Sequence, residues 1–211
     1  PELSLLAVAL LATMLAPTDA ALGKPVVTNP EVPAPIRESL NFESGLNDGI
    51  CVPVLFVFLG LAVGMEVEGG TFVHALRVVA EQLGIGLVVG LGLTAVAAWM
   101  LKVAAIRGWV TPHWLPIPVV ALAAACFAVA HELGGSGFIA CFAGGLLAGA
   151  MAKEHKHQLL AAAEGTGDVL ALLTWVIFGA GVVGQVASDF TWQVVLYAVL
   201  SLTVIRMVPV Y

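Results

Sequence analysis

Two carboxylates, a hydroxyl and an amide are gathered in the segment 43–49, ESGLNDG, which opens a long apolar run. If a membrane helix is counted from Asn41 at about 1.5 Å per residue, Asp48 lies roughly 10 Å inside the hydrophobic span. An acid at the centre of a bilayer costs about 2.5–3.5 kcal/mol, and such residues mark ion or proton pathways. Asp48 is therefore the first candidate for an ion-binding or proton-binding residue.

The spacing within this segment distributes its polar groups over two neighbouring helix faces. Ser44 and Asp48 are four positions apart and share one face, whereas Glu43 and Asn47 share the next. A hydroxyl and a carboxylate supply hard oxygen ligands, which small cations prefer. The Ser44–Asp48 face is therefore expected to bind a cation, and Glu43 is left for another role.

A second polar group ends the first apolar run, where Pro17 precedes Thr18 and Asp19. Proline removes a backbone donor and clashes with the preceding turn, so a helix is expected to break between Pro17 and Asp19. A broken helix at membrane depth is tolerated where it is buried or lines a wet cavity, and its freed carbonyls can coordinate cations. Thr18 and Asp19 are therefore expected to assist Asp48.

Arg206 lies in the last apolar run, with Ser201 and Thr203 as its only polar neighbours there. A guanidinium stays charged, so it needs a fixed acid nearby. Glu43 is the expected partner, because Asp48 must stay available for exchange. The alternative is that the side chain of Arg206 extends to the cytoplasmic surface.

The composition is that of an all-α integral membrane protein. Of the 211 residues, 60% are hydrophobic and 10% are charged, against roughly 45–50% and 25% in soluble domains. At about 20 apolar residues per span, about seven membrane helices are expected. They are placed near residues 3–20, 42–63, 72–101, 115–131, 136–152, 168–187 and 191–211.

The charges are spread in a way that suggests an orientation in the membrane. Most basic residues lie in the loops 21–40, 102–114 and 153–158, which places these loops in the cytoplasm. Arg77 is an exception and is expected to pair with Glu81, one helical turn later. With 14 acidic and 8 basic residues and no basic stripe, the chain is not expected to bind nucleic acid.

Glycines recur at four-residue spacing inside two of the apolar runs, at Gly86 and Gly90 and again at Gly145 and Gly149. Small residues at this spacing let membrane helices approach closely. Both pairs are expected to mark helix contacts.

Four features follow one another in a recognisable order: Pro17-Thr18-Asp19, the segment 43–49, the glycine-rich residues Gly135-Ser136-Gly137-Phe138 running into Ala143-Gly144-Gly145-Leu146, and Arg206. Together they resemble the monovalent cation:proton antiporters of the bacterial sodium/proton exchanger type. The resemblance covers nearly all of the chain, and the segment 43–49 is its most specific part. Where such families carry Thr-Asp-Pro, this chain has Thr18-Asp19-Ala20.

The resemblance implies a homodimeric, multi-pass exchanger of the cell inner membrane, built from inverted repeats with crossing broken helices. Residues 1–211 would be the central part of its transmembrane domain, with further helices before and after. Its ions would be H⁺ and Na⁺, or alternatively K⁺ or Li⁺, and no cofactor is implied. The implied ion-binding residues are Asp48, Ser44, Thr18, Asn47 and Asp19, and the implied structural ion pair is Glu43 with Arg206.

A single carboxylate with two competing ligands would account for such exchange. Burial disfavours a bare carboxylate, and either a proton or a cation removes its charge. Because Asp48 cannot hold both, alternating access by the loaded forms would couple the two fluxes. Asn47 cannot titrate, which predicts electroneutral exchange of one proton for one monovalent cation.

Two other classes of function stay open. Gly165-Thr166-Gly167-Asp168 is a literal GxGD sequence, and Asp168 with Asp48 would form the dyad of an intramembrane aspartyl protease. Against this, Glu164 four residues earlier suggests a polar turn at the membrane surface. The other class is a passive cation channel or a non-catalytic membrane scaffold, although one central acid and one broken helix do not make a continuous pore.

Overall fold

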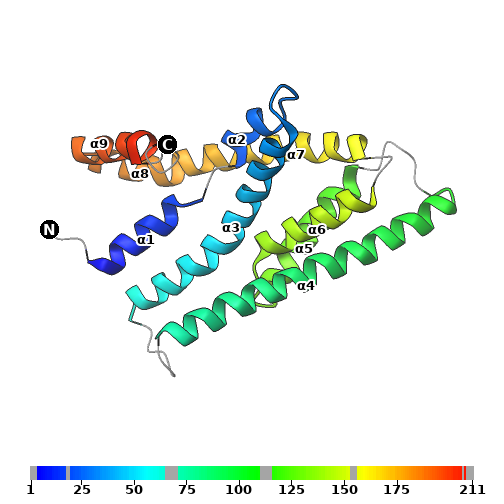
Figure 1. The fold of residues 1–211 in the computed structure, drawn as a ribbon, viewed down its shortest axis with the longest axis horizontal. Helices are drawn as coiled ribbons and strands as arrows, with labels where there is room; N and C mark the ends of the chain where they lie inside the picture. Colours follow the sequence, from blue (N-terminus) through cyan, green and yellow to red (C-terminus); the bar gives the residue numbers. More distant parts are fainter. Residues whose placement is uncertain are drawn as a thin grey trace. The chain divides into compact units, whose positions relative to one another are not determined.

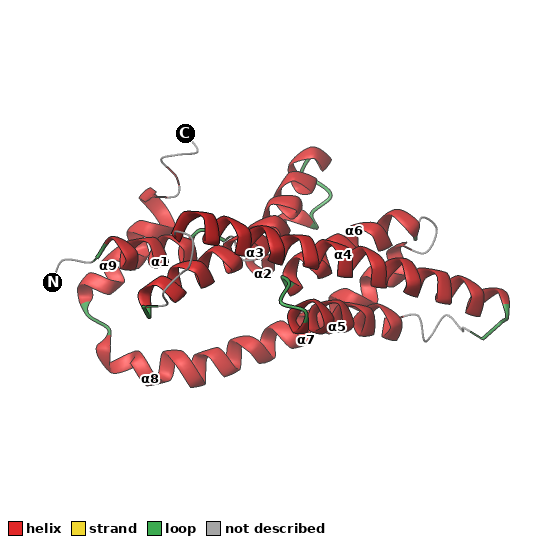
Figure 2. Cartoon of the chain, turned by 90° about the horizontal axis from the view of Figure 1, so that it is seen from below, coloured by secondary structure: helices red, strands yellow, loops and turns green. Residues whose placement is uncertain are grey.

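The computed structural model describes residues 4–17, 20–64, 71–109, 116–152, 156–205 and 207. Within these residues the protein is helical and contains no β-strand (Figure 2). The α-helices are α1 (Leu5–Leu15), α2 (Ala20–Val27), α3 (Ala34–Ala62), α4 (Thr71–Ile106), α5 (Pro116–Glu132), α6 (Gly137–Met151), α7 (Lys156–Phe178), α8 (Gly184–Val186) and α9 (Trp192–Leu200). The predicted all-α fold is confirmed for this part of the chain.

The chain divides into two compact units, residues 1–163 and 164–211. The first contains α1 to α6 and is the unit that carries the segment 43–49. Helix α7 begins within the first unit and crosses the boundary at residues 163 and 164. In the second unit it continues through a π-helical segment, η2 (Gly179–Val183), into α8 and the 3₁₀ turn η3 (Ala187–Asp189). Helix α9 ends in a second π-helical segment, η4 (Ser201–Ile205).

Three helices among the described residues are long and apolar enough to cross a membrane: Ala34–Ala62, Val73–Ile106 and Glu164–Val186. Four shorter apolar helices accompany them, at Leu5–Leu15, Ile117–Glu132, Gly137–Met151 and Trp192–Ile205. These seven elements correspond in order to the seven predicted spans.

The helix ends differ from those expected from hydropathy. Helix α3 begins at Ala34 rather than near residue 42; its N-cap is Pro33, and Pro35 lies in its first turn. Proline is favourable in the first turn of a helix, where no backbone N–H is needed, so the helix starts in polar sequence well before the apolar run. Helix α2 likewise occupies part of the predicted loop 21–40.

The predicted break in the first apolar run is confirmed by the helix ends on either side of it. Helix α1 ends at Leu15 and α2 begins at Ala20. Both helices pack against α3 (Figure 1). The break therefore separates two helices that share α3 as a neighbour.

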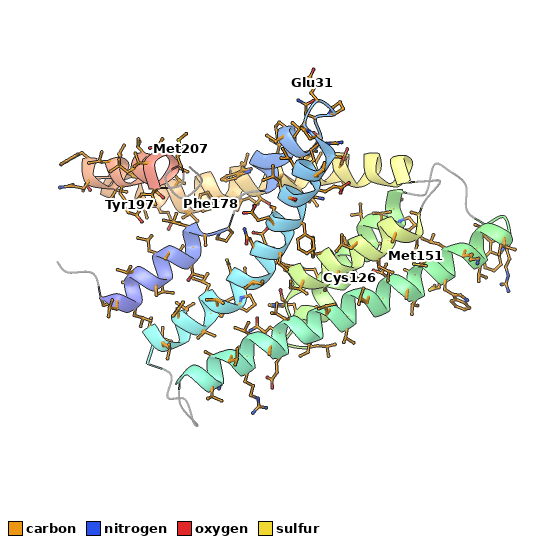
Figure 3. All side chains as sticks on the ribbon, viewed as in Figure 1. Glu31, Cys126, Met151, Phe178, Tyr197 and Met207 are labelled. Atoms are coloured by element: carbon orange, nitrogen blue, oxygen red, sulfur yellow. The ribbon has the colours of Figure 1, made fainter. Side chains whose placement is uncertain are left out.

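The tightest packing in the first unit is where α4, α5 and α6 meet (Figure 1). Its buried centre consists of Cys126, which is labelled in Figure 3, together with Ala130 and Ala140. Gly90 lies so close to α6 that a Cβ atom there would meet the backbone of Ala140. Such contact between backbones is how small residues hold membrane helices together.

The glycine prediction is confirmed for one pair and differs for the other. A Cβ atom at Gly86 would meet the backbone oxygen of Ser136, so Gly86 and Gly90 both face α6. Gly145 and Gly149 have open space beside them among the described residues. On α6 the close contacts are made instead by Gly144, packed against Thr94, and by Gly137, packed against Phe127.

Candidate functional site

Asp48 is the middle residue of the 29-residue helix α3. At about 1.5 Å per residue α3 is about 43 Å long, so it exceeds the roughly 30 Å hydrocarbon core of a bilayer. Ser44, Asn47 and Asp48 are half-buried in the first unit, while Glu43 is exposed there. The polar segment therefore lies around the middle of α3, between a polar first part and an apolar second part, rather than at the head of the helix.

The two predicted faces of the segment are seen in the structure. The amide nitrogen Nδ2 of Asn47 donates to Oε1 of Glu43 across 3.4 Å, which confirms that these residues share a face. Ser44 and Asp48 have the same four-residue spacing one position further along. The hydroxyl and the carboxylate therefore line a separate face from the Glu43–Asn47 pair.

Helix α3 is held against α6 by two glycines. A Cβ atom at Gly45 would collide with the ring of Phe142, and one at Gly49 would collide with the side chain of Ile139. Phe42 adds an edge-to-face contact with Phe142 at 5.4 Å between ring centres. Because successive helix residues are about 100° apart, Ser44 and Asp48 lie together to one side of this contact, and Glu43 with Asn47 lie on the far side of α3.

One contact from α6 reaches the backbone next to Asp48. The hydroxyl of Ser136 donates to the carbonyl oxygen of Gly49 across 3.5 Å, and both residues are buried. In the sequence, Ser136 stands out only as part of the glycine-rich segment 135–138, and no role was predicted for it. The signal that was available is Pro53, four residues after Gly49, because proline cannot bond to that carbonyl.

Three of the predicted site residues, Thr18, Asp19 and Arg206, lie outside the described residues. Their roles, including the pairing of Glu43 with Arg206, stay predictions. The described neighbours of the break, α1 and α2, both contact α3. Asp48 lies on α3, so the two helices next to Thr18 and Asp19 both contact the helix that carries Asp48.

Two other sets of charged residues singled out in the sequence are Asp168, from the protease alternative, and the pair Arg77 and Glu81. Asp168 is exposed and belongs to α7, in the second unit, with the whole GxGD sequence inside that helix. The predicted pair of Arg77 with Glu81 is confirmed, with Nε 2.7 Å from Oε1 and both side chains exposed. Arg77 and Glu81 lie on α4, so they are on a different helix from Ser44 and Asp48.

The comparison with protein families is decisive for the class of protein. The model of the family described as "sodium/hydrogen exchanger, transmembrane" matches residues 1–211. No solved structure matches the chain. The apolar helices and this match over the whole chain agree, and the chain belongs to the sodium/hydrogen exchanger family, a family of membrane transporters that exchange cations for protons.

Proposed function

We propose that the protein exchanges Na⁺ for H⁺ by alternating access, with Asp48 as the residue that binds each ion in turn. The observation that carries this proposal is the position of Asp48. It is the half-buried central residue of a membrane-length helix and has a hydroxyl, Ser44, one turn before it on the same face. Substrate and coupling-ion sites of secondary transporters lie near the bilayer midplane, where such a residue would be.

The chemistry of the exchange follows from the carboxylate. A bare carboxylate away from water is unfavourable, and it is neutralised either by a proton or by a cation. The oxygens of Ser44 and Asp48 are ligands of the kind that Na⁺ accepts. Since the two ligands compete for one group, release of one at each membrane surface accompanies uptake of the other.

The neighbouring residues have supporting roles in this proposal. Thr18 and Asp19 supply further oxygens from the broken segment between α1 and α2. Asn47 holds Glu43 through the bond between their side chains, and Glu43 balances the charge of Arg206. Asn47 carries no titratable group, so one proton is exchanged for one cation and the exchange is electroneutral.

The wider setting of the protein is part of the same proposal. The exchanger works as a homodimer in the cell inner membrane, with Na⁺ preferred over K⁺ or Li⁺. The residues 1–211 form the central part of its transmembrane domain.

The direct test measures proton flux driven by a Na⁺ gradient in liposomes that contain the full-length protein. Asp48→Asn is expected to lower exchange about a hundredfold or more, because an amide neither titrates nor carries charge. Asp168→Asn is the matched control and should retain exchange at close to the normal rate. Normal exchange by Asp48→Asn would refute the proposal.

The same liposomes separate the proposal from its rivals and from electrogenic exchange. Electroneutral exchange produces no current, so a membrane potential clamped at different values should leave the rate unchanged. A current that reverses with the Na⁺ gradient would contradict the one-to-one ratio. Na⁺ flux that needs no counter-moving proton would favour a channel.

A further inference from the structure

The carbonyl group of Gly49 follows Asp48 directly in α3 and has lost its normal helical partner. In an α-helix this carbonyl accepts from the N–H of the residue four positions later. That residue is Pro53, which lies inside α3, is buried, and has no N–H. A buried carbonyl without a donor is unfavourable, so it requires a partner from outside the helix.

Ser136 provides that partner from α6. Its hydroxyl donates to the oxygen of Gly49 across 3.5 Å, and the residue Ser136 is 5% exposed. The close approach that this bond needs is permitted by the missing side chain of Gly49, where a Cβ atom would collide with Ile139. The bond therefore depends on all three residues: Pro53 leaves the carbonyl without a donor, Gly49 allows the close approach, and Ser136 supplies the donor.

Ser136 is also attached to two further helices. Its backbone N–H donates to the carbonyl oxygen of Gln82 in α4 across 2.9 Å. Its Oγ accepts from the backbone N–H of Ile139 across 3.3 Å, which caps the start of α6. One buried serine thus joins α4 and α6 to the α3 backbone at the residue after Asp48.

We propose that Ser136 is a positioning residue for ion exchange, which sets the backbone of α3 beside Asp48 through the Gly49 carbonyl that Pro53 leaves unbonded. This inference rests on the proposed role of Asp48. When the hydroxyl is removed, the carbonyl is left without a donor and the α3 segment shifts against α6. The oxygens of Ser44 and Asp48 then meet the cation less well.

The test is a double-mutant cycle with Ser136→Ala and Pro53→Ala, using the full-length protein in liposomes and Na⁺ as the probe. Ser136→Ala is expected to raise the apparent KM for Na⁺ about fivefold, the effect of one hydrogen bond, while kcat stays within about twofold. Pro53→Ala restores a backbone donor to Gly49. In that background Ser136→Ala should leave KM nearly unchanged, because the carbonyl is already bonded.

The cycle separates positioning from a simple capping role. A cap lost at α6 would cost the same with or without Pro53, so an undiminished effect of Ser136→Ala in the Pro53→Ala background overturns the inference. Ser4 caps α1 through the N–H of Ala7 and serves as the matched control. Ser4→Ala should leave KM unchanged, and Ser136→Thr, which keeps a hydroxyl, should keep KM close to normal.

The inference can still be tested if Ser136→Ala folds poorly. If Ser136→Ala is not recovered folded, Pro53→Ala is compared with the double variant, and equal KM values support the inference whereas a fivefold difference refutes it. An unchanged KM in a folded Ser136→Ala protein also refutes it. Normal exchange by Asp48→Asn would instead remove the proposed function itself, so the two failures are distinguishable.

Discussion

Two polar pairs of similar spacing lie on the two longest helices of the first unit and have different environments. Arg77 and Glu81 pair with each other on α4, with side chains that are 75% and 54% exposed. Ser44 and Asp48 have the same spacing on α3 but are half-buried at its centre. Charge and spacing alone do not separate the two pairs. Burial within the first unit does, and it is the reason we propose Ser44 and Asp48, rather than Arg77 and Glu81, as the transport site.

The reason lies in what each environment demands of a charge. An exposed ion pair is solvated, and its net contribution to stability is small. A carboxylate at the centre of a membrane helix has to be neutralised by a ligand, a proton or an ion. Only the second situation makes binding of a mobile ion favourable.

The largest effect that would sharpen this comparison is expected from Glu43→Gln. In our proposal it leaves Arg206 without its acid, and an uncompensated charge away from water is strongly unfavourable. Because Arg206 would then be a charged group without a partner, the rate of exchange should fall about tenfold or more. The measurement is Na⁺-driven proton flux in liposomes, with Glu81→Gln as the matched change on α4. Equal rates for the two variants would show that Glu43 is no more than a surface acid.

An intermediate effect is expected from Ser44→Ala. Loss of one oxygen ligand beside Asp48 should raise the apparent KM for Na⁺ about fivefold and leave the maximal rate close to normal. Ser39, which is exposed on the same helix, is the control. Initial rates over a range of Na⁺ concentrations decide the question, and identical curves for Ser44→Ala and Ser39→Ala would remove Ser44 from the site.

The smallest effect is expected from Arg77→Ala. Its partner is Glu81 and the pair is exposed, so exchange should stay within about twofold of normal. The rate should also depend on salt no more than it does in the unchanged protein, because solvent and ions already screen this pair. A large loss of exchange would break the comparison, since it would give an exposed pair the importance assigned to Asp48.

The parts of the structure that were predictable are local in the chain. The helical spans follow from long apolar runs, and the ends of α1 and α2 follow from Pro17. The bond between Asn47 and Glu43 follows from four-residue spacing. Each depends only on residues that follow one another in the same stretch of chain.

Helix starts and helix contacts were predicted less well. Hydropathy measures how apolar a stretch is, whereas the start of α3 at Ala34 depends on proline in polar sequence. The four-residue glycine rule identified Gly86 and Gly90 but not Gly144, because the pattern does not say which side of α6 faces another helix.

The amino-acid sequence by itself determined the membrane class, the order of the helices and the identity of the central acid. These features depend on composition and on the spacing of residues along a helix, and both can be read from residues close together in the chain. The tertiary structure alone decided that α3 meets α6 through Gly45 and Gly49, and that Ser136 bonds to a carbonyl 87 residues away. Such contacts require two helices to approach closely, and no local pattern specifies which helices will do so.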